Sequence, residues 1–258
     1  MKAHIVLAHP EPQSYNAHLA RTARDQLERQ GYSVTISDLY AMNFDPCERA
    51  SHYPERIAPD RFDIQSEQRH ASSTGAMPAD IQEEIARLEA ADLLILQYPM
   101  WWHLPPAILK GWMDRVFIYG SVYTSKKRFE NGAFTGKKAM LSVTVGTSSA
   151  TYDHNGRSGD ISLMLWPVNF NLAYVGFDVL EPFIAYGVEA GLRYSTDKEV
   201  EGRLAGITED MRQSIAKLSS RATIPFNRMA EWGPDGHIVA DAPVYSPFIR
   251  HKKTLDLD

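Results

Sequence analysis

Apolar and polar positions alternate along the chain in the manner of an α/β protein. Five short segments predict strands, because they are apolar runs or alternate with a period of two: 5–8, 32–37, 93–96, 138–144 and 177–185. Longer segments repeat apolar residues at helical spacing: 16–30, 78–90, 106–117, 163–174 and 201–218. Because strand and helix alternate, we predict a doubly wound, five-stranded parallel sheet with helices on both faces.

Two segments depart from this alternation. Residues 39–76 contain Pro, Ser, His and charged residues without a period, and we read them as a long irregular excursion. Ordered loops of this length in compact domains are usually functional. Residues 219–258 contain several prolines and no apolar core of their own. We therefore expect a main domain over 1–218 and an irregular C-terminal extension over 219–258, which packs on the domain or on a partner subunit.

The loop after the third predicted strand carries the most informative residues. Pro99 ends that strand, because proline cannot donate to the ladder. Met100, Trp101, Trp102 and His103 follow before the next helix begins. Open α/β sheets bind ligands at the carboxyl ends of their strands, and aromatic rings there suit a flat, conjugated ligand. The alternative is that the two tryptophans only fill the core.

Two further loops at strand ends have suitable chemistry. His9, Ser14 and Asn16 lie between the first strand and the positive end of a helix, which indicates an anion or phosphate site. Without His9, the serine and the asparagine would favour plain helix capping. Small and hydroxyl residues fill the loop from Thr144 to Tyr152 after the fourth strand, so a ligand can approach the backbone closely there, or the loop is only a turn.

Composition narrows the function classes. The chain has 258 residues and a net charge of −5, so it has no basic excess for nucleic acid, and no apolar run approaches a membrane span. The N-terminus enters a strand without a signal peptide, and the single cysteine, Cys47, cannot form an intrachain disulfide, so we expect a cytoplasmic protein. The scattered histidines predict no metal site, and no P-loop, GxGxxG or GxSxG motif occurs.

Several segments, in order from Lys2 to Pro182, resemble the NAD(P)H:quinone oxidoreductases of the DT-diaphorase type. The matching segments are 7–9, 14–16, 88–92, 106–112, 141–144, 165–167 and 176–182. The resemblance implies a flavodoxin-like fold, a bound flavin and a homodimer with shared active sites. It implies two-electron reduction of quinones by NADH or NADPH, with hydride passing through flavin N5 in a ping-pong cycle. We favour FAD over FMN, because the 39–76 excursion can reach an adenosine with Gln65 or Gln68.

The resemblance also assigns residues to the site. His9, Ser14, Tyr15 and Asn16 are expected at the flavin phosphates, and Tyr152 at the N1/O2 edge of the ring. Pro99, Met100, Trp101 and Trp102 are expected along the ring, with Trp102 also serving catalysis. Thr144, Val145, Gly146 and Thr147 are expected to contact its polar edge through the backbone. The substrate pocket is expected to contain His103, together with Tyr123 and Tyr174 from the partner subunit.

The chain departs from the family pattern beside Tyr152. Mammalian members have a histidine six residues after this tyrosine, where this chain has Ser158. A second pocket tyrosine is replaced by Ser125. We therefore expect Arg157 to share with Tyr152 the stabilisation of the reduced ring. Two alternatives stay open: a reductase of azo or nitro compounds on the same flavin, and a flavin-binding electron carrier or regulatory subunit.

Overall fold

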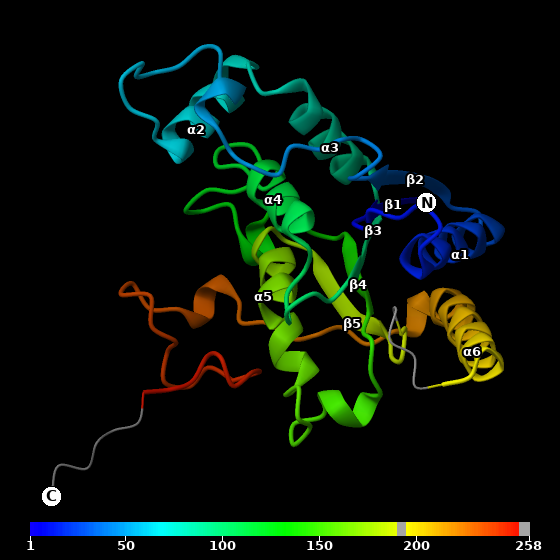
Figure 1. The fold of residues 1–258 in the computed structure, drawn as a ribbon. Coiled ribbons are helices and arrows are strands. Elements are labelled where there is room, and N and C mark those ends of the chain that lie inside the picture. The colour runs from blue at the N-terminus through cyan, green and yellow to red at the C-terminus, as the bar shows by residue number, and fades with distance from the viewer. Residues whose placement is uncertain (190–194, 253–258) are drawn as a thin grey trace, which may run out of the picture.

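The computed structural model describes residues 1–189 and 195–252, which contain one five-stranded parallel sheet. The strand order is β2-β1-β3-β4-β5 (Figure 1). The strands are β1 (Lys2–Leu7), β2 (Ser33–Asp38), β3 (Leu93–Pro99), β4 (Lys138–Thr144) and β5 (Asp178–Ala185). The order reverses at β1, as in the flavodoxin-like type of doubly wound sheet, so the predicted fold class is confirmed.

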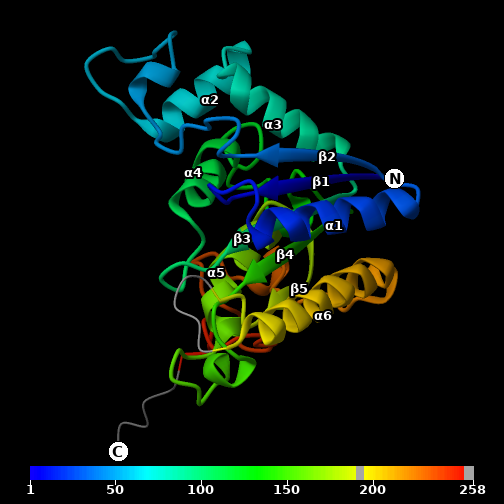
Figure 2. The same cartoon turned by 45° about the vertical axis from the view of Figure 1, so that its right-hand side comes forward.

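Helices cover both faces of the sheet (Figures 1 and 2). One face carries α1 (Tyr15–Arg29) and α6 (Asp197–Ala216), which pack on each other. The opposite face carries α3 (Ala79–Ala90), α4 (Ala107–Val116) and α5 (Ile161–Tyr174). Single 3₁₀ turns occur at η1 (Ala50–His52), η2 (Phe129–Asn131), η3 (Ser149–Tyr152), η4 (Leu218–Ser220) and η5 (Met229–Glu231). No helix in the described residues is both long and apolar enough to cross a membrane.

The middle of the sheet explains the apolar run that predicted it. All seven residues of β3 are buried, because β1 and β4 flank this strand and helices cover both of its faces. The outer edge of β5 is covered by the C-terminal segment, where Ile224 N–H donates to the Val179 carbonyl at 2.8 Å and Glu181 N–H donates to Ala222 at 2.9 Å. This pairing removes an open sheet edge.

The prediction of an irregular segment over 39–76 is wrong for α2 (Ile64–Thr74). This helix begins at Asp63, whose side chain accepts from Ser66 N–H, and ends at Gly75 with φ 75°. It was missed because its buried face is largely polar. Glu67 and Gln68 are buried there, with Glu67 bonded to Arg56 at 3.1 Å, so no apolar period is visible.

Two other helices begin at least two residues earlier than predicted. Helix α5 starts at Ile161 after the Asp160 cap, two residues before the expected start. Helix α6 starts at Asp197, because Thr196 and Glu199 form a capping box. Both helices start at a capping residue. The apolar repeat used for the prediction begins only inside each helix, so it placed the start too late.

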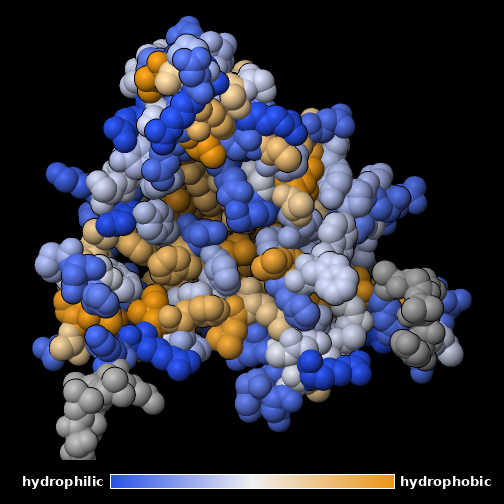
Figure 3. All heavy atoms as spheres, turned by 60° about the vertical axis from the view of Figure 1, so that its left-hand side comes forward, coloured by the Kyte–Doolittle hydropathy of each residue, from blue (hydrophilic) through white to orange (hydrophobic). Residues whose placement is uncertain are grey.

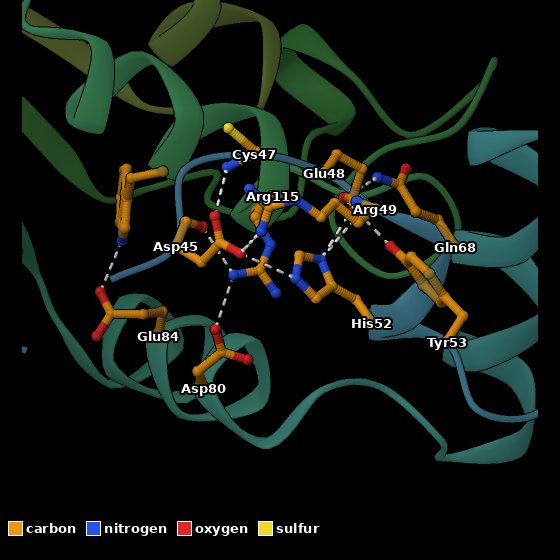
Figure 4. A network of polar contacts seen from close by, with 11 residues as sticks. Asp45, Cys47, Glu48, Arg49, His52, Tyr53, Gln68, Asp80, Glu84 and Arg115 are labelled. Carbon is orange, nitrogen blue, oxygen red and sulfur yellow. Dashed lines mark hydrogen bonds and ion pairs between the residues drawn. The ribbon is translucent and has the colours of Figure 1, made fainter. Parts of the chain in front are cut away.

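A polar network holds the segment before α2 in place (Figure 4). The buried guanidinium of Arg115 donates to the Asp45 carbonyl and to the Asp80 carboxylate, both at 2.9 Å. Tyr53 and Gln68 donate to the Glu48 carboxylate at 3.2 and 3.4 Å. Because burial raises the pKa of Tyr53 and Glu48 raises it further, this phenol stays protonated and acts as a donor.

A second buried carboxylate, Glu84, joins the sheet to two helices. It accepts from Ser37 and from the indole of Trp112, both at 2.7 Å, and pairs with Arg87 and the fully buried His4. Burial alone would raise the pKa of Glu84. The interactions with His4, Ser37 and Trp112 outweigh it and lower the pKa from 4.5 to about 2.

We expect Glu84→Gln to reduce the free energy of unfolding by about 3 kcal/mol, because the substitution leaves buried donors facing a neutral amide. Urea denaturation at pH 7 measures this change. The matched control is Glu83→Gln, which removes the exposed partner of the same Arg87 and should change stability by less than about 0.5 kcal/mol.

The Glu84 carboxylate should also make the stability of the protein depend on pH in the acid range. Since its pKa is lowered on folding, its contribution is complete above the ordinary value of 4.5 and is lost as pH falls towards about 2. Denaturation curves of the wild type and Glu84→Gln should therefore converge below pH 4. A stability difference that is constant down to pH 2 would contradict this account.

Candidate functional site

A pocket of about 770 Å³ lies at the carboxyl ends of the strands. The loops after β1, β3, β4 and β5 surround it, as expected for this type of sheet. We call it the strand-end pocket. Most of the residues assigned to the cofactor line it: His9, Ser14, Tyr15, Asn16, Pro99, Met100, Trp101, Thr144, Val145, Gly146 and Thr147, with Arg157 beside them. The three loops singled out in the sequence therefore meet at one place.

The amide of Asn16 holds this pocket together. Its Nδ2 donates to the Thr144 hydroxyl at 2.9 Å, and its Oδ1 accepts from Gln97 Nε2 at 2.8 Å. All three side chains are buried. The amide therefore joins the start of α1 to the ends of β3 and β4. Both polar atoms of the side chain thus have protein partners, and the amide nitrogen keeps one further N–H.

The other two residues at the start of α1 also have partners within the protein. The hydroxyl of Ser14 accepts from Ala17 N–H at 3.2 Å, which is a helix cap. The hydroxyl of Tyr15 donates to the Leu204 carbonyl on α6 at 2.6 Å. The first turn of α1 still presents its N–H groups and its positive dipole end to the pocket. The assignment of these residues to phosphate remains a prediction.

His9 is oriented by its own loop. Glu11 N–H donates to His9 Nδ1 at 3.0 Å, so Nδ1 is the acceptor of a neutral ring and Nε2 carries the proton. The ring lies 6.1 Å from that of Trp101, centroid to centroid. His9 therefore offers a hydrogen-bond donor on the same side of the pocket as the start of α1.

The loop after β4 presents unused donors. The buried hydroxyl of Thr147 has no hydrogen-bond partner among the described residues. The backbone N–H groups of Gly146, Thr147 and Ser148 likewise donate to nothing in the described chain. The loop is fixed from behind, because Gly187 N–H donates to the Thr147 carbonyl at 2.9 Å. A ligand with acceptors along one edge would satisfy these groups.

Arg157 lies on a tight loop beside this edge. Ser158 N–H donates to the Thr151 carbonyl at 3.0 Å, and a side chain at Gly156 would collide with the Thr151 backbone. This closure places Arg157 at the pocket, where it forms no ion pair with any described residue. Tyr152 does not line the pocket in the single chain. It packs against Tyr186, with ring centroids 6.3 Å apart.

Trp102 and His103 form the tip of a tight turn. Trp101 and Leu104 exchange backbone hydrogen bonds at 2.9 and 3.0 Å around them. Both tip residues have positive φ, 51° and 64°, a region that normally favours Gly or Asn, so the turn is strained. Trp102 is 92% exposed and lies outside the strand-end pocket. Its place along a ring, and that of His103 at substrate, remain predictions that a single chain does not test.

The remaining predicted residues meet in a second place. Gln65, Tyr123 and Tyr174 line a pocket of about 720 Å³ between α2, α4 and α5, which we call the aromatic pocket. Gln65 Nε2 donates to the Tyr123 hydroxyl at 3.3 Å, and the Tyr123 and Tyr174 rings meet edge to face. The single chain therefore divides the predicted site into two surfaces.

Four residues of the strand-end pocket had no role assigned from the sequence: Ser148 and Thr151, which lie in the predicted loop after the fourth strand, and Val188 and Glu189, which lie outside all three predicted loops. Glu189 pairs with Arg203 on α6 at 2.8 Å, and its other carboxylate oxygen is buried without a partner among the described residues. Val188 and Glu189 follow β5 directly. The rule that ligands bind at strand ends would have found both, had it been applied to the last strand as well.

The fold and this site define a class of protein. Residues 1–209 match the family model described as flavodoxin-like fold, and the chain belongs to that family. It is 39% identical over 229 residues to ribosyldihydronicotinamide dehydrogenase [quinone] of Mus musculus, which covers 87% of this chain and 96% of that relative. It is 41% identical over 189 residues to NAD(P)H dehydrogenase [quinone] 1 of Cavia porcellus, covering 72% of this chain and 69% of that relative.

A solved structure agrees. A protein of Klebsiella pneumoniae described as a candidate quinone reductase superposes with a TM-score of 0.83 at 33% identity. The match covers 92% of this chain and 93% of the other. The predicted resemblance to the quinone oxidoreductases is therefore confirmed.

Proposed function

We propose that this chain is a flavin-dependent NAD(P)H:quinone oxidoreductase of the cytoplasm. The observation that carries the proposal is the strand-end pocket, where free backbone donors face one hollow from the start of α1 and from the β4 loop. The two curated relatives, each a dehydrogenase with quinone in its name, support the same reaction. We infer that a nicotinamide donor and then a quinone occupy one place in turn.

The residues of the pocket fit a flavin. The first-turn N–H groups of α1 and Nε2 of His9 would hold phosphate. The unpartnered Thr147 hydroxyl and the N–H groups of the β4 loop would bond the polar edge of the ring. We favour FAD over FMN, because Gln65 lies at the aromatic pocket, where it would reach an adenosine across the dimer. Gln68 is less available, since it bonds Glu48 and Tyr119 N–H.

A bound flavin supplies the site with a hydride carrier. The protein contributes charge and position. Arg157 brings a permanent positive charge without a carboxylate partner among the described residues, and would stabilise negative charge that develops at the ring edge. Tyr152 would add a hydroxyl donor beside it. The small residues of the β4 loop allow close approach of a flat ligand.

We infer that two chains share their sites. The face that carries α2, α4 and α5 has apolar side chains gathered around a hollow (Figure 3). Ile64 lines the aromatic pocket on this side and is 44% exposed. A second copy seated there would bring its Tyr123 and Tyr174 to the strand-end pocket of the first, and would cover the exposed Trp102.

The purified protein should contain about one flavin per chain and should oxidise NADH or NADPH with a quinone. The reason is the fit of donors described above. Mass spectrometry of the cofactor released on denaturation decides between FAD and FMN. Parallel lines in double-reciprocal plots would show that donor and acceptor alternate in one place. A colourless protein that takes up neither flavin would end this proposal.

Arg157→Ala should slow reduction of the bound flavin by NADH about tenfold in stopped flow. The substitution removes a positive charge next to the place where the ring becomes negative, and water in the site limits the size of the effect. Tyr152→Phe should slow this reduction as well. The rate should not titrate between pH 6 and 7, since arginine stays protonated there.

The matched control for Arg157 is His154→Ala on the same loop. His154 is exposed and bonded to Asp153 at 2.9 Å, so its removal should leave the rate unchanged. If Arg157→Ala reduces flavin at the wild-type rate, Tyr152 is left as the only side chain with this role.

Light scattering should give a mass of about twice the 29.1 kDa chain. Ile64→Glu places a carboxylate in the aromatic pocket and should lower both the dimer fraction and quinone turnover. Met42→Glu, at an exposed apolar residue outside both pockets, should change neither. A monomer with full activity would contradict the shared site.

A further inference from the structure

A chain of three hydrogen-bonded side chains lies directly behind the strand-end pocket. Gln97 on β3 donates from Nε2 to Asn16 Oδ1 at 2.8 Å, and Asn16 donates from Nδ2 to the Thr144 hydroxyl at 2.9 Å. Asn16 and Thr144 line the pocket, whereas Gln97 does not and is completely buried. Gln97 therefore acts on a ligand in the pocket through the two residues in front of it.

Both donors in this chain point towards Thr144. The Thr144 oxygen accepts from Asn16, so the hydroxyl keeps its own hydrogen, which no acceptor among the described residues receives. Since Thr144 lines the pocket, this hydrogen is available to an acceptor atom of a ligand there. The reversed chain would have the opposite effect, because Thr144 would then donate to Asn16 Oδ1 and would offer the pocket only its lone pairs.

The surroundings of Gln97 favour the observed direction. Its Oε1 is buried and accepts no hydrogen bond in the described part of the chain. Turning both amides round would pair this oxygen with Asn16, and would leave both N–H groups of Gln97 without the acceptor that one of them now has. A buried N–H without an acceptor is rarer in proteins than an oxygen without a donor, so the reversed arrangement costs more free energy. Gln97 thus sets the direction in which Asn16 donates.

The backbone holds both ends of the chain in place. Ala8 N–H donates to the Gln97 carbonyl at 3.0 Å, and Met100 N–H donates to the Thr144 carbonyl at 2.9 Å. Gln97 and Thr144 lie on β3 and β4, which pair with each other inside the sheet. The Thr144 oxygen is thereby fixed, and the direction of the hydrogen bonds decides whether it acts towards the pocket as a donor or as an acceptor.

We propose that Gln97 is a positioning residue that keeps the Thr144 hydroxyl available as a hydrogen-bond donor to an acceptor atom of the bound flavin. This inference rests on the proposed function. The phosphate and the ring carbonyl groups of a flavin are acceptors, so a donor at Thr144 stabilises the complex and an acceptor there destabilises it. Gln97 selects the orientation of Asn16 and touches no part of the pocket itself.

The exchange of side-chain amide hydrogens tests the direction of the chain and needs no bound flavin. The full-length protein is made with isotope-labelled asparagine, and the Asn16 Nδ2 hydrogens are followed by NMR. The hydrogen that is bonded to Thr144 should exchange slowly in the wild type. Thr144→Val removes its acceptor and should accelerate this exchange about tenfold. An unchanged rate would show that Asn16 donates to Gln97 instead, and would overturn the proposal.

Flavin affinity tests the effect on the pocket. Gln97→Met keeps a side chain of similar volume and removes the donor, so Asn16 can turn round and accept from Thr144. The dissociation constant of the flavin, measured by fluorescence quenching as it rebinds to the stripped protein, should rise about fivefold. In Thr144→Val, which lacks the hydroxyl, the same substitution at Gln97 should change this constant less than about twofold. An equal rise in both backgrounds, or no rise in either, would overturn the proposal.

The matched control is Ser142→Ala. Ser142 lies opposite Gln97 in the pairing of β3 with β4, and its hydroxyl is buried without a hydrogen-bond partner among the described residues. Its removal also alters the buried layer behind the pocket but affects the orientation of no amide, so flavin affinity should stay at the wild-type value. If Ser142→Ala weakened binding as much as Gln97→Met, the loss would be a general effect of altering this layer, and the proposal would fail.

The two measurements separate this inference from the proposed function. If the wild type takes up neither FAD nor FMN, the proposed function fails, while the Asn16 exchange rate still decides whether the chain donates towards Thr144. If Gln97→Met binds flavin as tightly as the wild type, the proposed function stands and this inference fails. The exchange measurement uses no variant of Gln97, so it decides the direction even where Gln97→Met does not fold.

Discussion

The strand-end pocket depends on one buried amide, that of Asn16. Neighbouring parallel strands are not joined by a tight turn, so no backbone hydrogen bonds of the sheet hold the loops that follow their last residues. Asn16 supplies a donor to Thr144 on β4 and an acceptor to Gln97 on β3, from a helix that follows β1. A side chain of this length that both donates and accepts suits the place. Three loops are thereby held together before any ligand arrives.

Buried polar groups also hold the irregular parts of the fold. Glu84 collects donors from a strand and two helices, and Arg115 fastens the Asp45 loop to α3. The Asp45 loop leads into α2, which carries Gln65 to the aromatic pocket. An apolar contact could fill the same space but would not select one orientation of the loop, whereas hydrogen bonds to buried charged groups are directional. The aromatic pocket thus depends on these charged groups, and Glu48 of the same network lies in its wall.

The sheet and the three loops of the strand-end pocket followed from the sequence, because apolar runs mark buried strands and ligands bind where such strands end. Helix α2 did not follow, since Glu67 and Gln68 are buried by polar partners distant in sequence. Spacing along the chain also could not show that Gln65 and Tyr123 lie apart from His9 and Thr147. That separation depends on tertiary packing, which no local pattern along the chain encodes.

Arginine side chains with and without a carboxylate partner indicate where the protein can bind an anion. Arg203 forms an ion pair with Glu189 beside the strand-end pocket, so the Glu189 carboxylate adds little net charge there. Arg87 is likewise matched by Glu84. Arg157 and Arg128 each lie at a pocket without a carboxylate among the described residues. An ion pair would cancel the field of either group, so leaving these two unpaired in a chain of net charge −5 keeps positive potential at two separate places.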